Sequence, residues 1–241
     1  MSEALPWLVV GDVHGDLERL FKALSPYPPD QWRTLFLGDL VDGGPFGVGA
    51  LRYARDRPHS TVLLGNHEVL MLAALADRAN RGSPFLLWMS NGGQLHDLEE
   101  LAKDETLQEW LADRPALYRL DAGTLAQHCD NDGYGRLGGS LEEINQAVRR
   151  LLASGDFQPL WDLMTPQGIF RTQPARLESW LAKMGVRRLV HGHTPHQAPA
   201  PDVYAGGRAI DFDGSFGRFG GARYRRRRPV GASVAPLPPA R

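Results

Sequence analysis

The stretch Leu5-Pro-Trp-Leu-Val-Val-Gly-Asp-Val-His-Gly-Asp16 runs from an apolar segment into a polar turn that carries two glycines. Its apolar part, Leu5–Val10, has the length and composition of a buried strand, and the helix-like segment Leu17–Leu24 follows the turn. A strand that leads through a glycine-containing turn into a helix is the building unit of α/β proteins. The start of the chain therefore predicts an α/β fold with polar side chains at the end of a strand.

The same arrangement recurs twice further along the chain. Thr34–Leu37 leads into Gly38-Asp-Leu-Val-Asp-Gly-Gly44, and Thr61–Leu64 leads into Gly65-Asn-His-Glu68, with the helix-like Val69–Arg78 behind it. Open α/β folds bind their ligands at the carboxyl ends of their strands. We therefore expect the three polar turns to meet at one edge of a sheet and to form a ligand site there.

The remaining sequence predicts one domain followed by a basic end. Residues 1–217 are expected to form the domain, with residues 80–120 as a helical wall or cap of a cleft. Residues 218–241 are expected to hold a last strand and then a basic tail rich in proline and alanine. The later strand candidates are Thr124–His128, Arg188–His191 and Ala209–Asp211, and the later helix candidates are Leu141–Leu152 and Arg176–Met184.

The composition excludes several classes of protein. Of the 241 residues, 42% are hydrophobic and 23% are charged, which rules out a disordered, fibrous or disulfide-stapled chain. Cys129 is the single cysteine, so no disulfide forms within the chain, and a reducing compartment suits it. No apolar stretch approaches the roughly 20 residues that cross a bilayer, and the first residues lack the basic region of a signal peptide. We expect a cytoplasmic protein.

Charge is distributed unevenly along the chain. Seven arginines and no acids lie from Arg218 onward, so the net charge of −1 divides into +7 for this end and −8 for residues 1–217. The cluster Arg223–Arg228 could bind nucleic acid or another anionic partner. The composition favours the simpler interpretation, a solvated tail.

Oxygen and nitrogen donors stand at the ends of the expected strands. Such a mixed set suits Mn, Fe or Zn better than Ca or a metal that prefers thiolates. Six donors are too many for one tetrahedral ion and suit two ions that share a bridging carboxylate. Each motif taken alone could be a helix cap or a turn, but their order along the chain favours a metal site. Two aspartates, an asparagine and three histidines would make up the six ligands, and the donors at these strand ends are Asp12, His14, Asp39, Asp42, Asn66, His67, His128 and His193.

The ordered motifs resemble the signature blocks of the calcineurin-like metallophosphoesterases. The resemblance is closest to the phosphoprotein-phosphatase branch, which includes bacterial Ser/Thr protein phosphatases and symmetrical diadenosine tetraphosphatases. It covers about residues 5–215, and Trp88–Gly93 and Ile210–Gly214 resemble further segments of that branch. The matching blocks are Gly11–Gly15, Gly38–Gly44, Gly65–Glu68, the strand that ends at His128, and Gly192–Pro195.

This resemblance implies a four-layer α/β/β/α sandwich with two divalent metal ions, among which Mn is favoured. Asp12 and His14 would hold the first ion, Asp39 would bridge, and Asn66, His128 and His193 would hold the second. A bridging hydroxide would attack phosphorus in line.

The resemblance also implies the parts that act on substrate. His67 would be the general acid, oriented by Asp42, because a poor leaving group needs a proton in the transition state. Asn66, His67 and Arg171 would contact the phosphate.

One position departs from the family pattern. The family block reads Asp-Arg-Gly where this chain has Asp42-Gly43-Gly44, so an arginine that clamps phosphate is missing. Its loss should lower affinity or rate unless another cation replaces it. Arg171 resembles the family's second phosphate arginine, and this interpretation is favoured over that of a surface residue before a helix. Arg136 is a weaker candidate.

Four other polar residues are expected to have no catalytic part. Cys129 should be a buried thiol rather than a nucleophile, and His191 and His196 should be structural. Glu68 should stabilise the N-terminus of a helix.

The leading functional hypothesis is therefore two-metal hydrolysis of phosphomonoesters, as in a bacterial-type Ser/Thr protein phosphatase. The alternative enzyme cleaves dinucleoside polyphosphates or other nucleotide esters. The alternative from another class is a nucleic-acid-binding protein that uses the arginine-rich tail, although nucleic acid is an improbable partner and a membrane is not expected.

Overall fold

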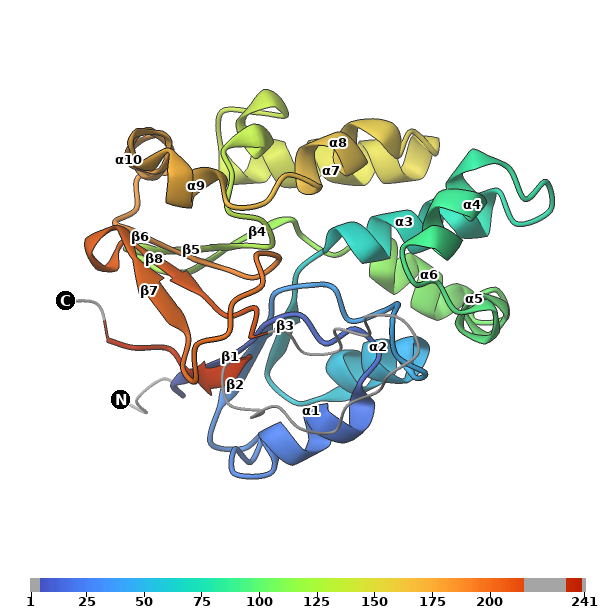
Figure 1. The fold of residues 1–241 in the computed structure, drawn as a ribbon, viewed down its shortest axis with the longest axis horizontal. Helices are drawn as coiled ribbons and strands as arrows, with labels where there is room; N and C mark the ends of the chain where they lie inside the picture. Colours follow the sequence, from blue (N-terminus) through green and yellow to red (C-terminus); the bar gives the residue numbers. More distant parts are fainter. Residues whose placement is uncertain (1–4, 215–232, 240–241) are drawn as a thin grey trace.

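Two β-sheets pack face to face, and helices cover the outer face of each, in a computed structural model that describes residues 5–214 and 233–239 (Figure 1). In Figure 1, α1 and α2 lie below the first sheet, and α7 to α10 lie above the second. This confirms the α/β class and the layer order of helix, sheet, sheet and helix that was expected.

The first sheet has four strands, three of which are parallel. Val10 of β1 lies opposite Phe36 of β2, which in turn lies opposite Val62 of β3, whereas β9 runs antiparallel to β1. Because parallel strands end at the same edge, the turns that follow β1, β2 and β3 open together. In order across the sheet, the strands are β3 (Ser60–Val62), β2 (Arg33–Phe36), β1 (Trp7–Val10) and β9 (Val234–Pro236).

The second sheet has five strands, of which the central three are parallel to one another. The two edge strands, β4 and β7, are antiparallel to their neighbours. In order across the sheet, the strands are β4 (Leu117–Asp121), β5 (Thr124–Gln127), β6 (Arg188–His191), β8 (Ala209–Asp211) and β7 (Asp202–Tyr204).

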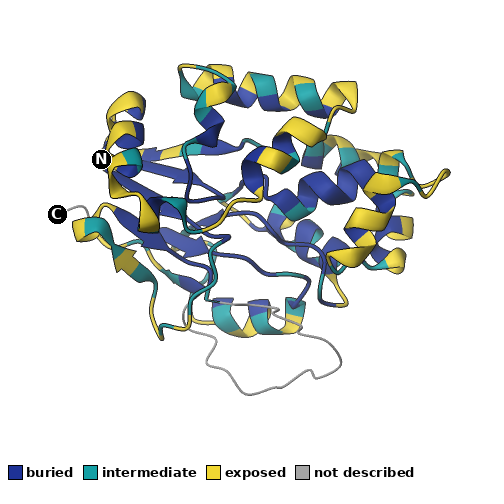
Figure 2. Cartoon of the chain, turned by 45° about the horizontal axis from the view of Figure 1, so that its top comes forward, coloured by how far each residue is buried: buried dark blue, intermediate teal, exposed yellow. Residues whose placement is uncertain are grey.

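Alternate residues of the central strands face two different cores. In β1, Val9 packs in the core between the two sheets, whereas Leu8 and Val10 pack in the larger core that includes the helices. A strand buried on both faces is apolar throughout, which explains the uninterrupted run Trp7–Val10. Figure 2 shows the strands buried and the helices exposed on their outward sides.

The helices fall into three groups around the sheets. On the first sheet lie α1 (Leu17–Leu24) and α2 (Gly47–Asp56). Beside the two sheets lie α3 (Asn66–Ala76), α4 (Ser83–Ser90), α5 (Leu95–Leu101) and α6 (Glu105–Ala112). Over the second sheet lie α7 (Leu141–Ser154), α8 (Gln158–Met164), α9 (Ile169–Thr172) and α10 (Pro174–Met184). Two short 3₁₀ helices, η1 (Gly133–Arg136) and η2 (Ala205–Gly207), complete the described elements.

The predicted elements agree with the observed ones in kind, with differences at some boundaries. The expected segments Leu17–Leu24, Arg188–His191 and Ala209–Asp211 match observed elements from end to end. By contrast, α3 begins at Asn66 rather than Val69, so two candidate site residues lie in its first turn. Helix α2 was not predicted, because its glycines disfavour a helix and its start depends on a distant carboxylate, Asp97, which accepts hydrogen bonds from its first two backbone N–H groups.

The arginine cluster Arg223–Arg228, on which the nucleic-acid hypothesis depends, lies outside the described residues. Within the described part of the chain, no helix has the length and apolar character required to traverse a bilayer.

Candidate metal centre and active site

A cavity of about 230 Å³ opens where the carboxyl ends of the parallel strands of both sheets meet. Its floor comes from the turns after β1, β2, β3, β6 and β8, and α8 and the segment behind it contribute one wall. The expected edge site is therefore present, and it draws on both sheets. The lining residues are Asp12, His14, Asp39, Asn66, His67, Asn91, Trp161, Thr165, Gln167, His193, Pro195 and Asp213.

Asp39 is at the centre of the candidate ligands. One carboxylate oxygen, Oδ2, lies 3.9 Å from Nε2 of His14 and 3.9 Å from Nε2 of His67. The other oxygen, Oδ1, lies 3.3 Å from Nε2 of His128, which is fully buried behind the cavity. Nε2 of His128 also lies 2.9 Å from Oδ1 of Asn66. Donors thus surround both oxygens of one carboxylate, as a bridging ligand requires.

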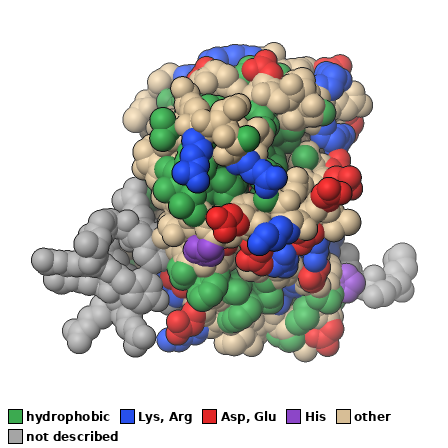
Figure 3. All heavy atoms as spheres, turned by 90° about the vertical axis from the view of Figure 1, so that its right-hand side faces the viewer, with side chains coloured by type: hydrophobic (Ala, Val, Ile, Leu, Met, Phe, Trp, Pro, Cys, Tyr) green, Lys and Arg blue, Asp and Glu red, His purple; other side chains and the backbone are tan. Residues whose placement is uncertain are grey.

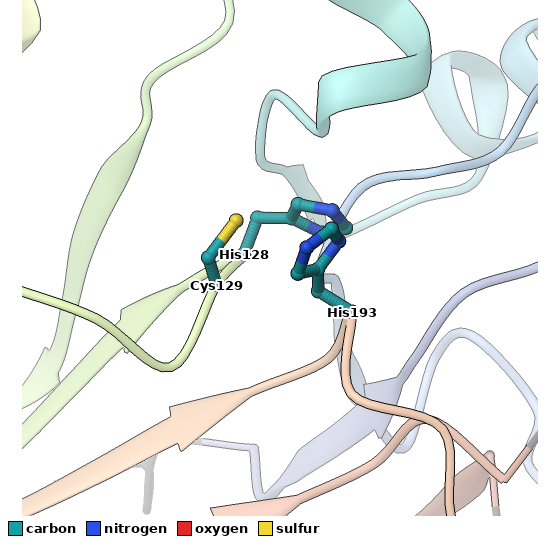
Figure 4. A group of neighbouring side chains, drawn as sticks. All are labelled: His128, Cys129 and His193. Atoms are coloured by element: carbon teal, nitrogen blue, oxygen red, sulfur yellow. The ribbon is translucent and has the colours of Figure 1, made fainter. Parts of the chain in front are cut away.

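Three overlapping groups of side chains place their ligand atoms within 4.8 Å of one another. Asp39 belongs to two of them, with His14 and His67 in one and with Asp12 and His128 in the other. The third group joins His128, Cys129 and His193; Figure 4 shows the two imidazoles against each other and the sulfur to one side.

Cys129 is buried, as predicted, and its thiol donates a hydrogen bond to the carbonyl of Met164 at 3.0 Å. Burial raises the pKa of the Cys129 thiol well above its ordinary value. A thiol held protonated in this way is a poor nucleophile.

Backbone carbonyls fix the orientation of the three histidines among the candidate ligands. Nδ1 of His128 donates to the carbonyl of Leu37 at 2.9 Å, and Nδ1 of His14 donates to the carbonyl of Val41 at 3.3 Å. His193 uses its other nitrogen, Nε2, which donates to the carbonyl of Thr165 at 3.1 Å. Each ring therefore has one nitrogen bonded to a carbonyl, and the other nitrogen faces the neighbouring donors. In His128 that nitrogen is Nε2, which lies beside Asn66 and Asp39.

Electrostatics in the cavity favour bound cations. Burial, with Asp213 and Asp39 nearby, raises the pKa of Asp12 well above its usual value. Burial lowers the pKa of His14 to about 4 and that of His193 to about 3, so both rings are neutral and can ligate a metal. No lysine or arginine is among the described residues that line the cavity. Crowded carboxylates beside the neutral imidazoles of His14 and His193 form a donor set that fits divalent metal ions.

Left-handed backbone is concentrated at this site. Among the described residues, seven that are not glycine have a positive φ, and four of these are His14, Asp39, Asp42 and His193, with φ between 49° and 65°. Such conformations are strained for residues with a Cβ, and proteins retain them mainly where function requires it. The strain thus falls on the turns that aim donors into the cavity.

Glu68 holds the turn that carries Asp39. Its buried carboxylate accepts hydrogen bonds from the backbone N–H groups of Asp39, Leu40, Val41 and Gly65, at 2.7 to 3.2 Å. The bond from Gly65 is the helix-capping role that was predicted. The other three bonds fix the metal-site turn, and the sequence alone did not indicate them.

His67 and Asp42 form a hydrogen-bonded pair beside the candidate ligands. Nδ1 of His67 lies 2.9 Å from Oδ2 of Asp42, and Trp88 donates its indole N–H to Oδ1 of the same carboxylate at 2.7 Å. Although burial lowers the pKa of His67, Asp39 and Asp42 together raise it to about 9. The ring thus keeps a proton at neutral pH, as a general acid must.

The structure does not bring Arg171 to the cavity. Its guanidinium forms ion pairs with Asp202 at 2.7 Å and with the buried Asp211 at 2.8 Å, and it lies over the ring of Tyr204. These acids hold the guanidinium at the β7 edge, so its position does not support the expected contact with phosphate. Arg136 also lies outside the cavity lining.

The remaining histidines of this region are also accounted for. Nε2 of His191 bonds to the hydroxyl of Tyr204 at 2.9 Å, and Nε2 of His196 bonds to the carbonyl of Asp211 at 3.1 Å. Neither lines the cavity, in agreement with the structural role expected for both.

Sequence reasoning missed several residues that line the cavity. Asn91 and Asp213 lie within the quoted blocks Trp88–Gly93 and Ile210–Gly214, so a signal was present for them although no role was assigned. Trp161 and Gln167 come from α8 and the loop behind it, where no motif marks them.

Comparison with known proteins gives consistent results. A family described as calcineurin-like phosphoesterase matches residues 5–197. Serine/threonine-protein phosphatase 1 of Salmonella typhimurium is 39% identical over 87 residues, which cover 35% of this chain and 38% of that protein. A symmetrical bis(5'-nucleosyl)-tetraphosphatase of Yersinia pseudotuberculosis is 26% identical over 174 residues, which cover 71% of this chain and 49% of that protein. The chain spans about half the length of these curated relatives, or less.

Solved structures agree with the fold. The crystal structure of a cold-active protein-tyrosine phosphatase from a psychrophilic Shewanella superimposes with a TM-score of 0.65 and 18% identity, over 89% of this chain and 72% of that one. At this identity, the likeness shows a shared fold alone.

Proposed function

Because the chain belongs to the calcineurin-like phosphoesterase family, we propose that it hydrolyses phosphomonoesters with two divalent cations, and that its substrates are phosphoserine or phosphothreonine in proteins. The convergence of five other ligand-type side chains around Asp39, beside the His67–Asp42 pair, is the observation that supports this proposal. A metal site that only stabilises the fold does not require a histidine hydrogen-bonded to a carboxylate beside its ligands.

We assign the candidate ligands to two positions that share Asp39. Asp12 and His14 would hold one cation, and Asn66, His128 and His193 the other. Cations bound there supply Lewis acidity to the phosphoryl group and acidify the attacking water. The oxygen and nitrogen donors suit Mn, Fe or Zn, and we propose Mn.

His67 and Asp42 act on the leaving group. With Nδ1 bonded to Asp42, the ring of His67 presents Nε2 toward Asp39 and the cavity. Nε2 would donate its proton to the ester oxygen as the bond to phosphorus breaks. Asp42 keeps the ring in the required tautomer and stabilises its charged form, and Asn66 and His67 would orient the phosphoryl group.

Three variants test this assignment with p-nitrophenyl phosphate and added Mn²⁺. In Asp39→Asn, bound metal and turnover should fall together, because both cations lose a ligand. In His67→Asn, metal content should stay near that of the wild type while turnover falls. Asp162→Asn is the matched control, since this exposed carboxylate bonds to Gln158 and is not among the described residues that line the cavity. Full metal content and turnover in Asp39→Asn would refute the two-metal scheme.

Dinucleoside polyphosphates are the second candidate substrates. The tetraphosphatase relative aligns over 71% of this chain, against 35% for the protein phosphatase, and Gly43 removes an arginine that would clamp a phosphomonoester. Turnover of a phosphoserine peptide and of diadenosine tetraphosphate, followed by product chromatography, separates the two. Faster turnover of the peptide supports the first proposal, and faster release of ADP supports the second.

A further inference from the structure

Trp88 contacts the acidic partner of the proposed general acid. Its side chain is fully buried at the end of α4, and its indole Nε1–H donates to Oδ1 of Asp42 at 2.7 Å. The other oxygen of Asp42, Oδ2, pairs with Nδ1 of His67 at 2.9 Å. Two helices therefore fix the two oxygens of one carboxylate, α3 through His67 and α4 through Trp88.

The turn behind Trp88 holds the indole in place. Gly93 lies directly against the ring, where a Cβ would overlap it, and its N–H donates to the carbonyl of Trp88 at 3.0 Å. The N–H of Gly43 donates to the carbonyl of Gly92 at 2.8 Å, which ties the Asp42 turn to the same segment. The block Trp88–Gly93 therefore contacts the turn that carries Asp42 at two points, once through a side chain and once through the backbone.

Packing alone does not account for a tryptophan at this position. A phenylalanine could supply the contact with Phe85, whose ring centroid lies 5.9 Å away. The outward side of α4 is itself apolar, since Leu86 and Met89 are exposed. Figure 3 shows hydrophobic side chains at the surface on this side of the molecule. The indole N–H is instead aimed at a carboxylate that is 1% exposed, and no other described residue donates to its Oδ1. Without that bond, the carboxylate could turn about its broad terminal torsion.

We propose that Trp88 is a positioning residue for proton donation: its indole N–H fixes the rotation of the Asp42 carboxylate, and through it the direction of Nε2 of His67. This inference depends on the proposed function, since it requires phosphoester hydrolysis with His67 as the proton donor. It also gives the block Trp88–Gly93 a role in the reaction, although Trp88 is not among the described residues that line the cavity.

The leaving group provides the test. Trp88→Phe keeps a buried ring and removes only the N–H. A general acid contributes about 10²- to 10⁴-fold where the leaving oxygen needs a proton, and little where it does not. In the Mn²⁺-loaded protein, kcat for an alkyl phosphate should therefore fall about tenfold, with KM unchanged. For 2,4-dinitrophenyl phosphate, kcat should change by less than about twofold.

A double-mutant cycle and a matched control complete the design. The quantity to compare is the ratio of kcat for the alkyl phosphate to kcat for 2,4-dinitrophenyl phosphate. If Trp88 acts through Asp42, then adding Trp88→Phe to Asp42→Asn should not change this ratio further. Trp180→Phe is the control, since that indole is also buried and donates at 2.8 Å, but to the amide of Gln127. It should leave the ratio at the wild-type value.

A readout that needs neither metal nor activity is the exchange of the Trp88 indole N–H with solvent, followed by NMR in the metal-free protein. Asp42→Ala should accelerate that exchange and leave the indole of Trp180 protected. The proposal would be overturned if Trp88→Phe lowered kcat equally for both esters. It would also be overturned if Asp42→Ala left the exchange rate of the Trp88 indole N–H unchanged. A wild-type protein that binds Mn²⁺ but hydrolyses neither ester would instead count against the proposed function.

Discussion

Replacing Glu68 by glutamine should destabilise the protein far more than the same replacement in an otherwise similar helix cap. The carboxylate of Glu68 accepts four backbone N–H groups, two on each oxygen: Leu40 and Val41 bond to Oε1, and Asp39 and Gly65 bond to Oε2. A glutamine has one oxygen, so its NH₂ group must face two of these donors. Two buried N–H groups then lose their acceptor.

The expected cost follows from those two bonds. A hydrogen bond to a charged group contributes about 1.5–3 kcal/mol, so Glu68→Gln should lower the free energy of unfolding by about 3–6 kcal/mol. For a protein of this size, that corresponds to a fall in Tm of about 6–24 °C. Because three of the four donors belong to the turn that carries Asp39, the affinity for Mn²⁺ should also fall, by about 10- to 100-fold.

Glu143 provides the matched control. It forms the same capping box at the start of α7, where its Oε2 accepts from the N–H groups of Gly139 and Ser140, but it is exposed to solvent. Glu143→Gln keeps one acceptor oxygen, and water can bond to any freed N–H, so it should cost about 0.5–1 kcal/mol.

Urea unfolding of both metal-free variants at pH 8 makes the comparison. Burial and the neighbouring Asp39 raise the pKa of Glu68 to about 7, so the carboxylate is mostly ionised at that pH. A cost for Glu68→Gln no larger than that for Glu143→Gln would show that the four bonds do not hold the turn.

Two further predictions concern charge in the cavity. Although burial lowers the pKa of His67, Asp39 and Asp42 raise it to about 9, so the ring carries the proton needed for donation below that pH. We therefore expect kcat for an alkyl phosphate to fall as the pH rises toward 9. The same fall in kcat in His67→Asn would contradict this role. Gly43 has a φ of 79°, so Gly43→Ala and Gly43→Arg should each lower the free energy of unfolding by about 1–2 kcal/mol. Only the arginine adds a cation beside the cavity, so only Gly43→Arg should lower KM for a phosphomonoester, and equal KM values in the two variants would contradict that expectation.

The sequence allowed the position of the site to be predicted because the site lies where strands end. A buried strand is recognisable from its apolar run, and a turn from its glycines, so the sequence alone predicts that Asp12, Asp39 and Asn66 lie at one edge of a sheet. His193 could be added because it follows another apolar run. The structure brings these residues to one cavity because parallel strands end at the same edge of a sheet, which is the argument on which the prediction was based.

Partners that are distant in the sequence could not be predicted in the same way. Arg171 was matched to a phosphate-binding arginine by its local sequence, yet Asp202 and Asp211 hold it, 31 and 40 residues further along the chain. Helix α2 escaped prediction because Asp97, 50 residues away, bonds to its first backbone N–H. Local patterns carry no information on which carboxylate will lie beside a given donor once the chain has folded.

The turn Gly38–Gly44 shows why this distinction matters for function. It carries both Asp39 and Asp42, each in a left-handed conformation that the turn would not hold by itself. Glu68 fixes its first half from 29 residues away, and Trp88 fixes its second half from 46 residues away. Neither residue is an expected ligand or proton donor, yet between them they hold the carboxylate that we propose as the shared ligand and the pair that we propose as the general acid. The reacting groups can therefore be found from motifs, whereas their geometry depends on two buried side chains in α3 and α4 that reach back to the turn.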